Sequence, residues 1–257
     1  MILLPVLSAE VLKLRRTIAL KMVVLAPVIV VLLVFLVVSQ APFSSLRRNG
    51  IRNEWIGLEN LSLFLWALLM MPLFVTLESA LVAGLDHSEN LWKSLLARPV
   101  PRWTFHVAKL MVVIAMTAIA TCILLCGILV SGKVLPHIQP EVVFAPPVPW
   151  STMVRDCAHV IGLMFLPLTI QQWVSLRWKS FSVATGTGIV ATVIAFFATA
   201  AARQAGDWMQ FFPWALPMIA VNTRRAYNIP ASLAISAVVG LVVAVTSCWD
   251  FCRREVT

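Results

Sequence analysis

The densest group of charged and aromatic side chains in this chain lies between residues 86 and 102. Asp86 and Glu89 have the three-residue spacing of a helix-capping pair, so a helix is predicted to begin at Asp86. Two prolines follow and would end this helix, which we place at residues 86–98. It can dock into a groove of a partner protein or lie on a membrane surface as packing. Its apolar stripe consists of Leu91, Trp92, Leu95 and Leu96.

The chain lacks the sequence motifs of common catalytic and nucleotide-binding sites. It contains no Gly-x-x-x-x-Gly-Lys-[Ser/Thr] loop to hold ATP phosphates, and no His-Glu-x-x-His or Gly-x-Ser-x-Gly motif of a hydrolase. The cysteines are interpreted as small apolar residues. We therefore predict that the chain is not an enzyme and has no catalytic, cofactor-binding or metal-binding residues of its own.

Six apolar runs must position the segment described above. Each holds about 20 residues without Asp, Glu, Lys or Arg, which is the length a helix needs to cross a bilayer. The chain is 60% hydrophobic and 12% charged, whereas soluble domains have about 45–50% and 25%. We predict an all-α integral membrane protein with a single transmembrane domain, residues 1–257. The predicted spans are residues 22–38, 61–77, 110–130, 157–174, 181–202 and 229–249.

The N-terminal segment, residues 1–21, is predicted to form an amphipathic helix before the first span. Its apolar stripe is expected to face the membrane and its polar stripe water, although it could also simply extend the first span. The apolar stripe consists of Leu7, Val11, Leu14 and Ile18, and the polar stripe of Glu10, Lys13, Thr17 and Lys21, with Arg15 and Arg16 close by.

A second short segment, residues 208–221, is apolar but too short to span a bilayer. Pro213 and Pro217 interrupt it, so we predict a re-entrant or interfacial segment. Its aromatic residues suit the water–lipid boundary, where they could shape a substrate exit. They are Trp208, Phe211, Phe212 and Trp214.

The basic residues lie mostly beside the ends of the spans. The net charge of +9 therefore indicates orientation and contact with lipid headgroups, and no nucleic-acid partner is predicted. If the N-terminus is cytoplasmic, 12 of the 20 basic residues lie on cytoplasmic segments, which favours both termini inside.

Several other residues carry local predictions. Glu78, where the second span ends, is expected to reach the interface or cap a helix, and it could also take part in coupling, together with Arg102. The proline-rich stretch 131–153 is expected to be extended. Gly186 and Gly188 are interpreted as small residues that permit close helix packing.

Four motifs, in their residues and in their order along the chain, resemble those of the ABC-2 type permease family. The resemblance is closest to its lantibiotic-immunity and export subfamily. The similarity covers essentially the whole chain. The motifs are Glu10-x-x-Lys13-x-Arg15-Arg16, Glu89-x-x-Trp92-Lys93-x-Leu95-Leu96-x-x-Pro99-Val100-x-Arg102 with Lys109 after it, Gln172-Trp173-x-Ser175-Leu176-Arg177, and Pro213-Trp214.

This resemblance implies the membrane subunit of an ATP-driven exporter in the bacterial cytoplasmic membrane. It implies an elbow helix before the first span, a coupling helix at 86–98 and re-entrant helices before the last span. It also implies separate P-loop ATPase subunits that bind ATP and Mg²⁺, a second permease, identical or homologous, and contact with membrane lipids. The residues that would contact the ATPase are Asp86, Glu89, Trp92, Lys93 and Arg98.

The low polarity of the predicted spans indicates an amphipathic cargo: a peptide, a lantibiotic-like molecule or a lipid-like molecule. Two alternatives remain. An ion-coupled secondary transporter needs ionisable groups inside the membrane, and the predicted spans contain only His159. A structural or sensory membrane subunit has no sequence signature of its own.

Overall fold

A computed structural model describes residues 3–15, 17–40, 53–88, 100–140, 144, 147–200, 211–221 and 227–253. Every regular element within these ranges is helical. The elements are α1 (Leu3–Leu14), α2 (Ile18–Gln40), α4 (Glu54–Leu65), the π-helical turn η1 (Trp66–Met70), α5 (Met71–Ser88), α7 (Arg102–Ile138), α8 (Trp150–Arg177), α9 (Phe181–Ala200), the 3-10 turn η3 (Pro213–Ala215), α10 (Leu216–Ile219) and α11 (Ile229–Arg253).

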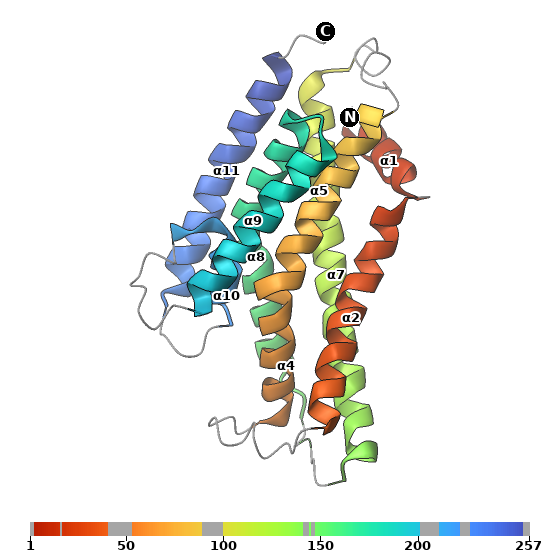
Figure 1. Ribbon diagram of the computed structural model, residues 1–257, viewed down its shortest axis with the longest axis vertical. Helices are drawn as coiled ribbons and strands as arrows, with labels where there is room; N and C mark the ends of the chain where they lie inside the picture. The colour runs from red at the N-terminus through yellow and green to blue at the C-terminus, as the bar shows by residue number, and fades with distance from the viewer. Residues whose placement is uncertain are drawn as a thin grey trace.

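The long helices form an elongated bundle, with α1 set at an angle beside one end (Figure 1). Both chain termini lie at this end, and so do the end of α5 and the start of α7 (Figure 1). The main core joins α2, η1, α5, α7 and α8, and its largest fully buried side chains include Trp66, Met71 and Leu124. We call the end that carries the termini the terminal end of the bundle.

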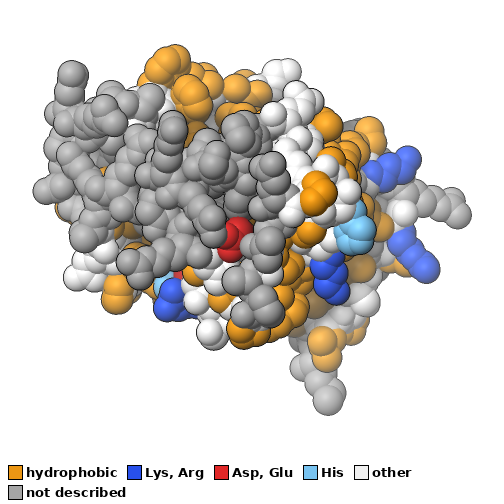
Figure 2. Space-filling model, turned by 90° about the horizontal axis from the view of Figure 1, so that it is seen from below, with side chains coloured by type: hydrophobic (Ala, Val, Ile, Leu, Met, Phe, Trp, Pro, Cys, Tyr) orange, Lys and Arg blue, Asp and Glu red, His pale blue; other side chains and the backbone are white. Residues whose placement is uncertain are grey.

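Six stretches of helix in the described residues are long and apolar enough to cross a membrane, which confirms the prediction of a helical membrane protein with six spans. They are Ile18–Gln40, Glu54–Leu85, Arg102–Ile138, Trp150–Arg177, Phe181–Thr199 and Ile229–Arg253. Large apolar side chains of α2, α9 and α11 lie exposed on the flanks of the bundle, as expected for helices that face lipid. Figure 2 shows the end opposite the termini, where apolar side chains cover much of the described surface between scattered basic ones.

The second span is continuous from Glu54 to Ser88 because a π-helical turn accommodates a proline. Pro72 has no N–H for the carbonyl four residues earlier and its ring would collide with that carbonyl. The wider turn at Trp66–Met70 lies immediately before it. Trp66 is fully buried there, and its Nε1 donates a hydrogen bond of 3.2 Å to Thr121 Oγ1 on α7.

Two predicted boundaries are wrong. No helix begins at Asp86, because α5 continues through this position to Ser88 with Val82 and Ala83 still buried in the bundle. The proline-rich stretch is also shorter than predicted, because α7 runs through Pro136 to Ile138 and buries Leu135 in the core.

The two glycines of α9 differ in their surroundings. A Cβ added at Gly188 would meet the side chain of Thr76 on α5 and approach Gln171 Oε1 on α8 to 2.8 Å, whereas a Cβ at Gly186 would meet nothing within 4 Å. The predicted packing role is therefore confirmed for Gly188 and wrong for Gly186.

This difference predicts opposite effects for one substitution. Gly188→Ala should destabilise the protein by about 1–3 kcal/mol, because the added methyl group overpacks the contact of three helices. Gly186→Ala gains the same helix propensity without a collision and should be neutral or stabilising by up to about 1 kcal/mol. Unfolding of both purified variants in one detergent measures the difference, and equal stabilities would contradict the packing role.

Candidate functional site

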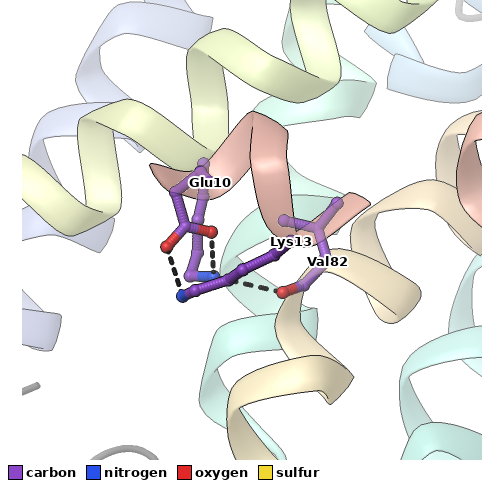
Figure 3. Close-up of polar contacts among 4 residues, drawn as sticks. Glu10, Lys13 and Val82 are labelled. Carbon is purple, nitrogen blue, oxygen red and sulfur yellow. Dashed lines mark hydrogen bonds and ion pairs between the residues drawn. The ribbon is translucent and has the colours of Figure 1, made fainter. Parts of the chain in front are cut away.

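A buried ion pair joins the N-terminal helix to the bundle at its terminal end. Lys109 Nζ on α7 lies 2.9 Å from Glu10 Oε2 on α1 and donates a second hydrogen bond of 3.1 Å to the carbonyl of Val82 on α5. Lys13 Nζ bonds the other oxygen of Glu10 at 2.6 Å (Figure 3). Glu10 is 4% exposed and Lys109 is 1% exposed, so the pair is shielded from solvent. It therefore fixes α1 against both helices that flank residues 89–99.

The orientation of α1 differs from the sequence prediction. Glu10 belongs to the stripe that was predicted to face water, yet it is buried, while Val11 of the apolar stripe is half exposed. The reason is that Lys109 needs a counterion inside the bundle, and burying an unpaired ammonium group is costlier than exposing a valine. Arg15 is exposed, and Arg16 lies outside the described residues.

Polar contacts at the same end also join α11 to its neighbours. His106 Nε2 on α7 and Ser247 Oγ on α11 share a buried hydrogen bond of 2.8 Å. Trp173 Nε1 on α8 donates to Asp250 Oδ2 at 3.0 Å, and Arg102 Nη1 donates to the carbonyl of Cys252 at 3.3 Å. The first turns of α7 and the last turns of α8 and α11 are thereby connected.

Further polar side chains are buried on α5 and α8. Among the described residues, the carboxyl oxygens of Glu78, the hydroxyls of Ser79 and Ser175, and the amide of Gln172 have no hydrogen-bond partner. Glu78 is 0% exposed, so the prediction that it reaches the interface or caps a helix is wrong. Buried polar groups without partners are rare and costly, which marks them as candidates for function.

These groups lie at similar heights in the bundle. Thr76 on α5 and Gln171 on α8 both approach Gly188, and Gln171 Nε2 donates to the carbonyl of Ala184 on α9 at 2.7 Å. Successive α-helical residues rise by about 1.5 Å, and α5 and α8 run in the same direction. Glu78 therefore lies about 3 Å beyond this contact, and Ser175 lies about 6 Å beyond it.

We refer to these buried groups at the terminal end as the polar layer. It contains the ion pair, the hydrogen bonds to α11 and the groups without partners. Its members are Glu10, Glu78, Ser79, His106, Lys109, Gln172, Ser175 and Ser247. The layer contacts the last turns of α5 and the first turns of α7, which are the two helices on either side of the predicted coupling segment.

The other predicted site residues are only partly described. Glu89, Trp92, Lys93 and Arg98 lie outside the described residues, as do Trp208 and the side chain of Asp86. Phe211 is exposed, whereas Phe212 and Trp214 pack beside Ala195 and Ala198 of α9. Pro213 begins the 3-10 turn η3, which leads into the short helix α10.

Sequence reasoning missed several members of the polar layer. Lys109 and Gln172 appear in the motifs quoted above but were not predicted as site residues, and His106 was not singled out. Their position in the sequence could have identified them as candidates. Each lies at the end of an apolar run, or within a few residues of it, and the helix continues through that position. The described residues contain no group of three or more His, Cys, Asp and Glu side chains that could hold a metal ion.

Comparison with known proteins agrees with this architecture. A family model described as ABC-2 family transporter protein matches residues 6–199, which include most of α1, both helices that flank residues 89–99, and α8. No curated protein matches the chain. No solved structure matches it either.

Proposed function

The chain belongs to the ABC-2 transporter family, and from this premise we propose that it is the permease of an ATP-driven exporter whose ATP is hydrolysed by separate P-loop subunits. It is a multi-pass membrane protein and a transport permease subunit. We further propose that it pairs with a second permease, identical or homologous, in the bacterial cytoplasmic membrane. Both termini, and residues 86–98 with them, would face the cytoplasm.

The polar layer is the observation that carries this proposal. An ATPase that moves the segment 89–99 would pull on the end of α5 and the start of α7 together, because both are continuous with it. Lys109 binds both α1 and the backbone of α5, and His106 binds α11. A displacement at the cytoplasmic end would therefore reach four helices through direct contacts.

The cargo that we propose is amphipathic: a peptide, a lantibiotic-like molecule or a lipid-like molecule. The flanks of the bundle and much of its core are apolar, so a strongly hydrophilic solute would lose its hydrogen bonds along most of its path. The aromatic residues around η3 are proposed to border its exit.

One observation favours ion-coupled transport as a second candidate. The membrane-spanning helices contain buried ionisable residues that the shorter predicted spans excluded, namely Glu59, Glu78, His106 and Lys109. The sequence argument against an ion pathway did not consider these residues. Transport by the reconstituted protein that continues without ATP and follows an ion gradient would favour this candidate.

Trp92→Ala tests the ATPase partnership. If Trp92 is the aromatic anchor of the coupling helix, its truncation should cost about 2 kcal/mol of binding, or about 30-fold in affinity for the ATPase subunit. Co-purification with the ATPase measures the loss. Trp150→Ala is the matched control, because this half-exposed tryptophan begins α8 at the opposite end of the bundle. Equal binding by both variants would contradict the docking role.

A further inference from the structure

The last candidate span, α11, carries one continuous apolar face that no other described element covers. It has the smallest buried fraction of the six spans and lies on the flank of the bundle (Figure 1). Four exposed residues follow one another at spacings of four, three and four, which places them on one helix face. We call this face the α11 stripe, and it consists of Val238, Val242, Val245 and Trp249.

The length of the α11 stripe matches one leaflet of a bilayer. Trp249 lies eleven residues after Val238, which is about 16 Å along the helix axis. The hydrocarbon core of a bilayer is about 30 Å thick, so one leaflet contributes about 15 Å. Trp249 ends the stripe towards the terminal end of the bundle and is 57% exposed, as suits a tryptophan at the water–lipid boundary. One acyl chain therefore fits along the stripe with its headgroup beside Trp249.

A guanidinium group lies where that headgroup would be. Arg253 is exposed, and its Cζ lies 3.8 Å from the centroid of the Trp249 ring. This cation–π contact holds the charge one turn back along α11, at the level of Trp249. Arg253 makes no hydrogen bond or ion pair with the residues that the structure describes. Its flat face lies on the indole, so the N–H groups at its edge are available to an acceptor.

The neighbouring charges favour an anion at this position. Arg102 Nη1 on α7 donates to the carbonyl of Cys252, which places a second guanidinium group beside the residue before Arg253. Asp250, the only acidic residue of α11, accepts a hydrogen bond from Trp173 on α8 and lies about 100° around the helix from the α11 stripe. Further exposed basic side chains at the terminal end are Arg15, Lys21, Arg177 and Lys179.

These features distinguish a lipid from a second copy of the chain. Two copies that met through the α11 stripe about a two-fold axis along the membrane normal would bring their Arg253 groups together at one level, and like charges in contact are costly. A phosphate accepts bidentate hydrogen bonds from a guanidinium group, and the phosphates of a leaflet lie just outside its hydrocarbon. A phospholipid therefore complements both the apolar stripe and its charged end.

We propose that the α11 stripe and Arg253 together bind an anionic phospholipid of the leaflet at the terminal end. An acyl chain lies along Val238, Val242 and Val245, and the phosphate accepts hydrogen bonds from Arg253. The positive charge of Arg102 selects a headgroup that has no ammonium group. This site goes beyond the proposed transport function and does not depend on it.

Photo-crosslinking with a lipid tests this site. The probe is phosphatidylglycerol with a diazirine in one acyl chain, added at a low fraction to the full-length protein in phosphatidylcholine nanodiscs. Cross-links are expected in the peptide that contains Val238, Val242 and Val245. Replacing part of the phosphatidylcholine by unlabelled phosphatidylglycerol should suppress this labelling, whereas the same fraction of phosphatidylethanolamine should not. Equal suppression by the two lipids would overturn the selection of an anionic headgroup.

Three variants test the headgroup contact. Arg253→Gln should reduce the labelling of α11 about tenfold, as expected for the loss of a hydrogen bond between charged groups. Trp249→Leu keeps an apolar side chain but removes the ring that holds Arg253, and it should reduce the labelling about threefold. Arg177→Gln is the matched control, because it removes an exposed arginine from α8 at the same end of the bundle, and it should leave the labelling of α11 unchanged.

Two results would overturn the site itself. One is equal labelling of α11 in Arg253→Gln and Arg177→Gln, which would show that Arg253 does not hold the lipid. The other is efficient disulfide formation between two copies of Val242→Cys together with no labelling of α11 by the probe, which would show that a second permease covers the stripe. None of these measurements needs the ATPase, so they are independent of the proposed export function.

Discussion

Replacing Lys109 by methionine should destabilise the protein by about 3–5 kcal/mol, the largest effect expected of any substitution proposed above. The change leaves the buried carboxylate of Glu10 with only the partly exposed Lys13 beside it, and breaking one side of a buried ion pair typically costs this much. It also removes the hydrogen bond from Nζ to the Val82 carbonyl. Denaturant unfolding of the purified variant measures the loss, and release of α1 should appear as faster proteolysis of the N-terminal segment.

Two further variants separate the ion pair from other effects of the substitution. Lys133→Met removes an exposed lysine from the same helix near its other end and should change the unfolding free energy by less than about 0.5 kcal/mol. The double variant Glu10→Leu/Lys109→Met removes both charges and should recover most of the stability. A double variant as unstable as Lys109→Met alone would show that the pair does not explain the loss.

The fold class could be predicted because it depends on local composition. A run of about 20 apolar residues has few alternatives to a membrane span. The ends of the helices could not be predicted in the same way. Each predicted span was ended where a charged residue occurs, but the helices continue past such residues. Glu59 and Lys109 are fully buried inside longer helices, where neighbouring helices shield or pair them.

The candidate site was less accessible to sequence reasoning, because its contacts are distant along the chain. Glu10 and Lys109 are separated by 99 residues, and His106 and Ser247 by 141. No periodicity within α1 indicates that its glutamate turns inward, since the counterion belongs to another helix. The motifs that resemble the permease family include both Glu10 and Lys109, but a sequence motif does not show which of its residues are in contact.

The second large effect concerns Glu78, where stability and function should change in opposite directions. Glu78→Leu should stabilise the protein by about 1–3 kcal/mol, because the buried carboxyl group has no hydrogen-bond partner among the described residues and leucine removes its desolvation cost. A native residue that lowers stability in this way is retained for function, so the same variant should lose most ATP-dependent transport.

Glu10→Leu is the matched control for Glu78→Leu, because it makes the same substitution at a paired carboxylate in the same layer. It should destabilise the protein by about 3–5 kcal/mol, since it breaks the buried ion pair between Glu10 and Lys109. Unfolding of both variants in one detergent shows whether each substitution raises or lowers the free energy of unfolding. Transport by the reconstituted complex measures the functional loss in Glu78→Leu. If Glu78→Leu destabilised the protein as much as Glu10→Leu, Glu78 would be a structural member of the bundle, and its proposed place in coupling would have to be given up.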